Sequence, residues 1–94
     1  MFQELNPLIH SQLRLSIMTL LAAVAEADFN YLRERTQATA GNLSVQLDKL
    51  NRAGYIHITK EFVGRKSHTV CRLTDDGRRA LEEYVAALKS YLNL

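Results

Sequence analysis

The stretch TAGNLSVQLDKLNRAGYI, residues 39 to 56, combines an apolar repeat of helical spacing with a polar outer side. Leu43, Leu47 and Leu50 fall at i, i+4 and i+7, so they share one face of a helix. Thr39 can cap the start of this helix, and Gly54 follows its end, where a residue of positive φ often closes a helix. The stretch therefore predicts a helix over about residues 40–53, with its leucines facing a core.

The other positions of this helix point away from the leucines. They are Asn42, Ser44, Val45, Gln46, Asp48, Lys49 and Arg52. The first four lie in the first two turns, where a helix that enters the major groove of DNA carries its base-reading side chains. Short amide and hydroxyl groups suit recognition better than the Glu and Lys that solubility alone would favour.

Two β-prone segments, 55–62 and 67–73, follow this helix and read as a hairpin. If the turn centres on Gly64 and Arg65, the numbers of paired positions sum to 129. On that register the inner face carries Ile56, Ile58, Cys71 and Leu73. The tip of the hairpin is expected to be basic and exposed.

Three further helices are expected around these elements. Apolar residues recur at spacings of three and four over 10–25, which predicts a first helix. Asn30 is expected to cap a short second helix that ends near Thr36, and Thr74 to cap a last helix that runs to about residue 92. The predicted fold class is mainly α with a small β-hairpin, in a single domain over residues 1–94.

Composition places the chain among ordinary globular proteins. Of its 94 residues, 47% are hydrophobic and 23% are charged. Cys71 has no intrachain partner for a disulfide, and the sequence contains neither a secretory signal pattern nor an apolar run near the ~18 residues that a membrane span needs. The expected compartment is the cytoplasm, with no membrane partner.

The net charge of +2 is unevenly distributed. Residues 33–72 hold eight basic and three acidic residues, whereas the segments on either side are slightly acidic. A basic middle could neutralise the phosphates of a nucleic acid, although a solvated basic surface would give the same count.

The order of elements decides between these two interpretations. A helix, a short helix, a turn, an apolar-faced helix closed by Gly and a hairpin with a basic tip resemble a winged helix-turn-helix, as in the compact single-domain members of the MarR-like and ArsR-like transcriptional regulators. The matching residues are Gly41-Asn42-Leu43-Ser44 with Leu47, Lys49 and Leu50, then Ala53-Gly54-Tyr55-Ile56, then Gly64-Arg65-Lys66, and Arg72-Leu73-Thr74 with Gly77-Arg78. The resemblance extends from about residue 8 to residue 92.

The resemblance implies a regulator that binds double-stranded DNA in a sequence-specific manner. Its recognition helix, about 40–53, would enter the major groove, and its wing, 62–67, would lie on the backbone or in the minor groove. Base contacts are expected from Asn42, Ser44, Val45 and Gln46, and backbone contacts from Thr39, Lys49, Arg65 and Lys66. Gln46 could bond an adenine edge in two places, and the absence of Arg from the first turns favours an A·T-leaning site.

Such regulators generally bind as homodimers joined through their terminal helices, and surplus apolar residues support the same expectation here. The expected dimer contacts are Leu5, Leu8, Ile9, Leu81, Tyr84, Val85, Leu88, Tyr91 and Leu92. A two-fold dimer would place two recognition helices roughly 34 Å apart on a near-palindrome.

Catalysis, a cofactor and a metal are not expected, because His10, His57 and His68 are scattered and no triad or facing carboxylate pair occurs. Two alternatives stay open: a winged-helix module that binds other proteins, and a repressor that responds to a metal or to oxidation through Cys71. The operator, the regulated genes, the sign of regulation and any effector are not specified by the sequence.

Overall fold

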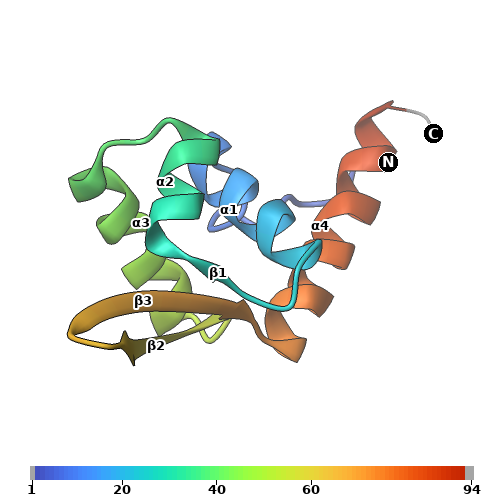
Figure 1. The fold of residues 1–94 in the computed structure, drawn as a ribbon. Coiled ribbons are helices and arrows are strands. Elements are labelled where there is room, and N and C mark those ends of the chain that lie inside the picture. Colours follow the sequence, from blue (N-terminus) through green and yellow to red (C-terminus); the bar gives the residue numbers. More distant parts are fainter. Residues whose placement is uncertain (1, 93–94) are drawn as a thin grey trace.

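The structure is a computed structural model that describes residues 2–92. Its helices pack around a small antiparallel sheet (Figure 1). In chain order they are α1 (Gln12–Ala22), β1 (Ala27–Asp28), α2 (Phe29–Thr36), α3 (Ala40–Arg52), β2 (Ile56–Val63), β3 (Lys66–Leu73) and α4 (Asp75–Leu92). The predicted class, mainly helical with a β-hairpin, is confirmed. None of the helices within residues 2–92 is long and apolar enough to cross a membrane.

The hairpin of β2 and β3 has the predicted register. Ile56 pairs with Leu73 and Ile58 pairs with Cys71, as the sum of 129 requires. Gly64 has a φ of +65° at the first central position of the two-residue turn, the position where a type II′ turn needs glycine. The strands are therefore aligned by local turn chemistry.

A third strand, β1, was not predicted from the sequence. Its two residues, Ala27 and Asp28, pair antiparallel with Cys71 and Val70 of β3, which gives the sheet order β1-β3-β2. This short strand ties the chain between α1 and α2 to the base of the hairpin.

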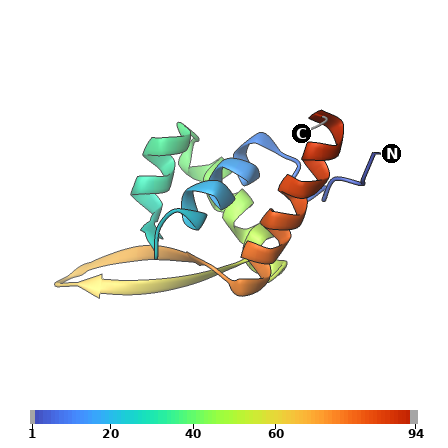
Figure 2. The ribbon, with the colours of Figure 1, turned by 90° about the vertical axis from the view of Figure 1, so that its right-hand side faces the viewer.

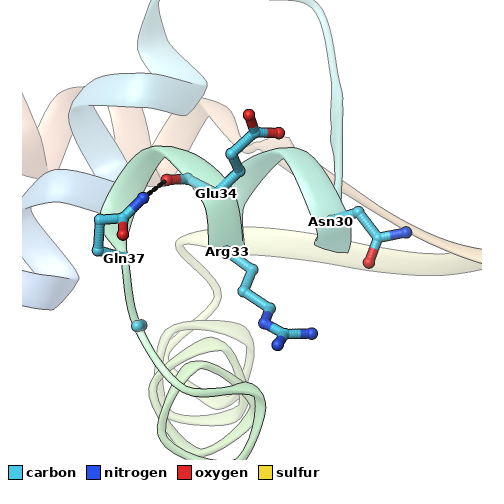
Figure 3. Close-up of a pocket in the computed structure, with 5 residues that line it drawn as sticks. Asn30, Arg33, Glu34 and Gln37 are labelled. Atoms are coloured by element: carbon cyan, nitrogen blue, oxygen red, sulfur yellow. Dashed lines mark hydrogen bonds between the residues drawn. The ribbon is translucent and has the colours of Figure 1, made fainter.

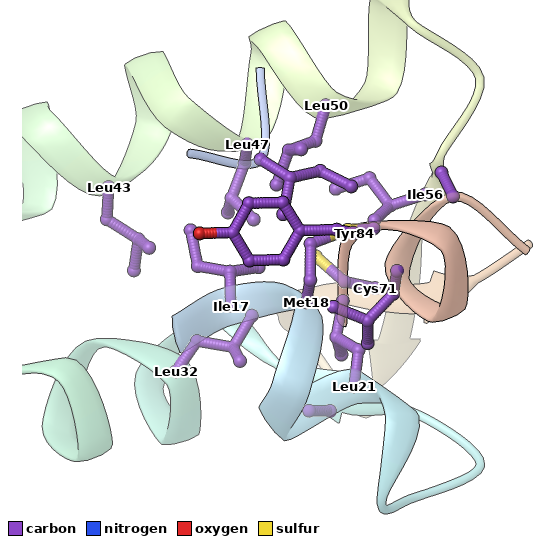
Figure 4. Packing of buried hydrophobic residues seen from close by; sticks show 14 residues of the cluster. Ile17, Met18, Leu21, Leu32, Leu43, Leu47, Leu50, Ile56, Cys71 and Tyr84 are labelled. Atoms are coloured by element: carbon purple, nitrogen blue, oxygen red, sulfur yellow. The ribbon is translucent and has the colours of Figure 1, made fainter. Parts of the chain in front are cut away.

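The core lies between the helices and the inner face of the sheet (Figure 4). The predicted leucine face of α3 is confirmed, because all three of its leucines are buried. They pack in one cluster with Ile17, Met18, Leu21, Leu32, Ile56 and Cys71. The buried leucines therefore hold α3 in place, and its opposite side carries the candidate binding face. Each fully buried leucine contributes roughly 1.5–3 kcal/mol of favourable burial free energy.

Two helix starts differ from the sequence prediction. Asp28, not Asn30, caps α2, because its carboxylate accepts the backbone N–H of Tyr31 at 2.7 Å. Strand pairing holds Asp28 in the extended conformation that a cap requires, and Asn30 falls inside the first turn. The first helix is also shorter than the expected range 10–25, since Ser11 caps it and it ends at Ala22.

The N-terminal segment lies beside α4 (Figure 2). The ring of Phe2 stacks on Tyr91 with 4.8 Å between centroids, and the backbone N–H of Gln3 donates to Ser90 Oγ at 3.2 Å. Further along, Asn6 Nδ2 donates to the hydroxyl of Tyr55 at 3.0 Å. Part of the apolar surface expected to meet a second chain is therefore covered within this one.

Three of the expected dimer residues belong to the chain's own core. Ile9, Leu81 and Tyr84 are buried against α1 and its neighbours, and the Tyr84 hydroxyl lies 2.9 Å from Nδ1 of His10. The expectation that they form an exposed stripe is wrong, because helical spacing shows that a face is apolar but not which element covers it.

Candidate nucleic-acid interface

The flank of α3 opposite its leucines is open to solvent. Asn42 and Ser44 are exposed, Val45 is 51% exposed, and Gln46 is half-buried at the edge facing α1. Asp48 and Arg52, one turn apart on the same flank, form an exposed ion pair at 3.0 Å. The four residues expected to read bases therefore share the accessible side of one helix.

The start of α3 is held by Thr39. Its hydroxyl accepts the backbone N–H of Asn42 at 3.1 Å, as predicted for an N-cap. This engagement leaves the side chain at the exposed entrance of the helix, where the positive end of the helix dipole and free N–H groups favour an anion.

The end of α3 is a Schellman motif. Tyr55 N–H donates to the carbonyl of Leu50 and Gly54 N–H donates to that of Asn51, both at 3.0 Å. Gly54 has the left-handed φ of +79° that this closure requires. The chain consequently turns directly from α3 into β2, which places the hairpin next to the polar flank.

Gln46 is engaged at both ends of its amide. Arg14 Nη1 donates to Oε1, and Nε2 donates to Asn42 Oδ1 at 3.0 Å. The expected two-point contact with adenine would need these groups to be shared or released. Arg14 was not among the residues chosen from the sequence, since it lies on α1 and 32 positions away.

The hairpin extends away from the helices as a wing (Figures 1 and 2). Arg65 and Lys66 lie exposed at its tip, as expected. The tip also carries Phe62 and Val63, which are 73% and 69% exposed. They were not singled out from the sequence, because consecutive strand residues face opposite sides and the sequence does not show where the hairpin extends beyond the helices.

The surface of α2 adds a basic residue that the sequence did not single out. Arg33 and Asn30 point away from their helix beside a shallow depression also lined by Glu34 and Gln37 (Figure 3). Gln37 ends α2 in the left-handed conformation, with φ of +59°, and its Nε2 donates to the carbonyl of Glu34 at 2.7 Å. The signal that could have identified Arg33 is its place on α2, the helix just before α3.

Not every basic residue of the middle segment is free to meet an anion. Arg72 bridges Glu26 and Glu61 across the sheet, and it also donates to Thr59 Oγ1 at 3.2 Å. The two glutamates neutralise the charge of Arg72, so this residue stabilises the base of the wing instead of being available to an anion.

Cys71 is fully buried on the inner face of the sheet. Burial, helped by the nearby charge of Asp28, raises the pKa of the Cys71 thiol to about 11. A thiol with such a pKa is a weak nucleophile and a weak metal ligand at neutral pH. Within residues 2–92, no three His, Cys, Asp or Glu side chains gather closely enough to hold a metal ion.

Comparison with known proteins agrees with this geometry. Residues 13–92 match the family described as the winged helix DNA-binding domain. The uncharacterized protein MJ0432 of Methanocaldococcus jannaschii is 32% identical over 78 residues, which are 83% of this chain and 85% of that protein.

Solved structures share the fold, and two of them are described here by their similarity to this chain. One, a transcriptional regulator homologue from Pyrococcus horikoshii OT3, is 26% identical with a TM-score of 0.84 and coverage of 92% of this chain and 85% of that chain. The other, the zinc-responsive MarR family member ZitR of Lactococcus lactis, is 18% identical with a TM-score of 0.65, and 97% of this chain spans 58% of that one. The expected resemblance is confirmed: this chain belongs to the winged helix DNA-binding domain family, whose solved neighbours in fold are transcriptional regulators.

Proposed function

We propose that the protein regulates transcription by binding duplex DNA as a homodimer, with α3 in the major groove and the wing on the backbone or minor groove. The observation that carries the proposal is the division of α3 into a buried leucine face and an exposed polar flank, beside a projecting cationic wing. A helix of this kind can enter a groove because Asn42, Ser44 and Val45 on its polar flank are exposed.

In this proposal Asn42, Ser44 and Val45 contact base edges, and the Val45 methyls suit the methyl group of thymine. Backbone contacts come from Thr39 at the start of α3 and from Lys49, Arg65 and Lys66. These last three are exposed and form no ion pair among the described residues, so their charges are available to phosphates.

The proposed dimer surface is narrower than the one expected from the sequence. It uses the exposed apolar side chains of α4, namely Val85, Tyr91 and Leu92, with Phe2 stacked beside them. The proposed surface also includes Leu5, Leu8 and Leu88, which are half-buried and pack against the core. A two-fold arrangement through α4 would present two α3 helices to one face of the DNA.

A salt titration tests the proposal. Three cationic contacts per protomer give six per dimer, so the logarithm of the affinity for a random duplex should fall with the logarithm of salt concentration at a slope of roughly −5. Fluorescence anisotropy between about 50 and 200 mM salt measures this slope. A slope near zero would show that the surface does not bind DNA and would favour a protein partner.

A further inference from the structure

Arg14 links the first helix to the recognition helix. From α1 its Nε donates to the carbonyl of Leu8, and its Nη1 donates to Oε1 of Gln46 on α3. The side chain is half-buried between the two helices. One guanidinium thus contacts both the N-terminal segment and a residue of the polar flank.

The direction of these hydrogen bonds is fixed by chemistry. A guanidinium has five N–H donors and no acceptor, so the Gln46 amide must turn its oxygen toward Arg14. Its NH₂ group then faces Asn42 and donates to Oδ1 at 3.0 Å. With its oxygen engaged, the Asn42 amide has its own NH₂ group left to offer.

The backbone of Asn42 is held as well. Its N–H donates to the hydroxyl of Thr39, so the residue sits in the first turn of α3 with both main chain and side chain anchored. Two hydrogen bonds thus run in one direction, from Arg14 to Gln46 and from Gln46 to Asn42. We call this chain the relay; neighbouring hydrogen bonds of this kind strengthen one another.

We infer that Arg14 is a positioning residue for base recognition: through Gln46 it sets Asn42 to act as a hydrogen-bond donor in the major groove. This inference rests on the proposed function. A donor selects base edges that carry acceptors, such as N7 and O6 of guanine or O4 of thymine, and it disfavours the amino group of cytosine. Gln46 supports Asn42 from behind instead of pairing with adenine in two places.

The test uses the 94-residue protein and an operator selected from a random duplex pool. Arg14→Met keeps a long side chain and removes all donors. Binding is measured to duplexes with each base at the position read by Asn42, which is the position where Asn42→Ala loses its preference, and to a random duplex. Arg14→Met should lower discrimination there about tenfold, the size of one lost base contact, and leave random-duplex affinity and the salt slope unchanged.

A double-mutant comparison separates positioning from simple packing. In a Gln46→Met background, Arg14→Met should cause no further loss of discrimination, because the relay is already broken. Arg14→Lys, which restores one donor group, should recover part of the discrimination. Additive losses in the double variant would overturn the inference, and so would an equal loss on all duplexes.

A measurement without DNA tests the hydrogen bonds of the relay separately from the proposed function. In wild-type protein the Gln46 NH₂ group, which donates to Asn42, should exchange slowly with solvent in NMR spectra. Arg14→Met should shift the side-chain NH₂ signals of Gln46 and Asn42 and speed the exchange of the Gln46 group. Unchanged signals would overturn the relay whether or not the protein binds DNA. If the signals change but Asn42→Ala alters no base preference, base reading by Asn42 is wrong and the positioning role of Arg14 with it.

Discussion

A methyl group on Gly77 would lie 2.0 Å from the carbonyl oxygen of Tyr55. That carbonyl accepts the backbone N–H of Thr74 at 3.0 Å, and the N–H of Tyr55 closes α3 through Leu50. The first turn of α4 is therefore packed directly on the junction of α3 and β2. This junction fixes the orientation of α4 relative to α3. In the proposed function α4 joins two chains and α3 contacts DNA, so the junction also sets how the dimer surface lies relative to the DNA-binding surface.

Gly77→Ala should destabilise the protein by about 1–3 kcal/mol, the usual range for overpacking, because the obstructing atom is backbone. Urea unfolding measures the change. Gly41→Ala is the matched control: Gly41 lies in α3 with nothing within 4 Å of the added methyl, so alanine should stabilise by roughly 0.5–1 kcal/mol. Similar effects at both glycines would argue against the close contact at Tyr55.

Thr39→Asp should separate the capping role of residue 39 from its contact with phosphate. Aspartate is as good an N-cap as threonine, so the stability should stay within about 0.5 kcal/mol, whereas Thr39→Ala should cost about 1 kcal/mol. The added carboxylate would repel the DNA backbone, so the affinity of Thr39→Asp for all duplexes should fall. Thermal unfolding and anisotropy with a random duplex measure the two effects. Undiminished affinity would remove Thr39 from the interface.

Arg65→Ala combined with Lys66→Ala should weaken binding to every duplex alike and flatten the salt slope by roughly 3 to 4, because four phosphate contacts per dimer are lost. Arg78→Ala with Lys89→Ala removes the same two charges from α4, away from the wing, and should leave the slope unchanged. A loss confined to one operator would instead assign the wing to base reading.

Cys71 should resist alkylation in the folded protein. Because its pKa is raised to about 11, far less thiolate is present at pH 8 than for an ordinary thiol, and burial blocks access as well. The raised pKa also means that this residue stabilises the fold below its ordinary pKa of 9.0 and that the contribution is lost as pH rises toward 11. Mass spectrometry after iodoacetamide should find modification only in denaturant. Rapid labelling of the folded protein would instead support the alternative in which Cys71 responds to oxidation.

Local patterns predicted the elements whose geometry is local. The leucine face of α3 followed from helical spacing, and the hairpin register followed from the turn at Gly64, because a two-residue turn fixes every pair behind it. The capping role of Asp28 could not be predicted locally, because Asp28 lies in β1, a strand that forms only by pairing with β3.

The remaining discrepancies have the same origin in contacts between distant residues. Ile9 and Tyr84 were assigned to a dimer because an apolar stripe does not specify its partner, and the partner proved to be the same chain. At the candidate site, the exposed flank of α3 was predictable. The tie from Arg14 to Gln46 was not, since it depends on how α1 packs against α3.

Val85→Glu should convert the proposed dimer into a folded monomer. Val85 is 41% exposed on α4, so a charge there disturbs no core contact of the single chain. The new carboxylate would precede Lys89 by four residues, an arrangement that favours the helix. Burying it against a second α4 would be costly, because the charge would be removed from water into an apolar contact surface. Sedimentation velocity should show the mass of a monomer, with unchanged circular dichroism, and operator binding should weaken strongly.

Val45→Glu is the matched control, because Val45 is 51% exposed on α3 and also precedes a lysine, Lys49, by four residues. The same substitution there should leave the dimer intact and abolish DNA binding, since the carboxylate would face base edges and phosphates. The two variants should therefore lose binding for different reasons: one loses its partner and the other its contact surface. If Val85→Glu stays dimeric while Val45→Glu becomes monomeric, α3 is the subunit interface, and the assignment of its polar flank to DNA is wrong.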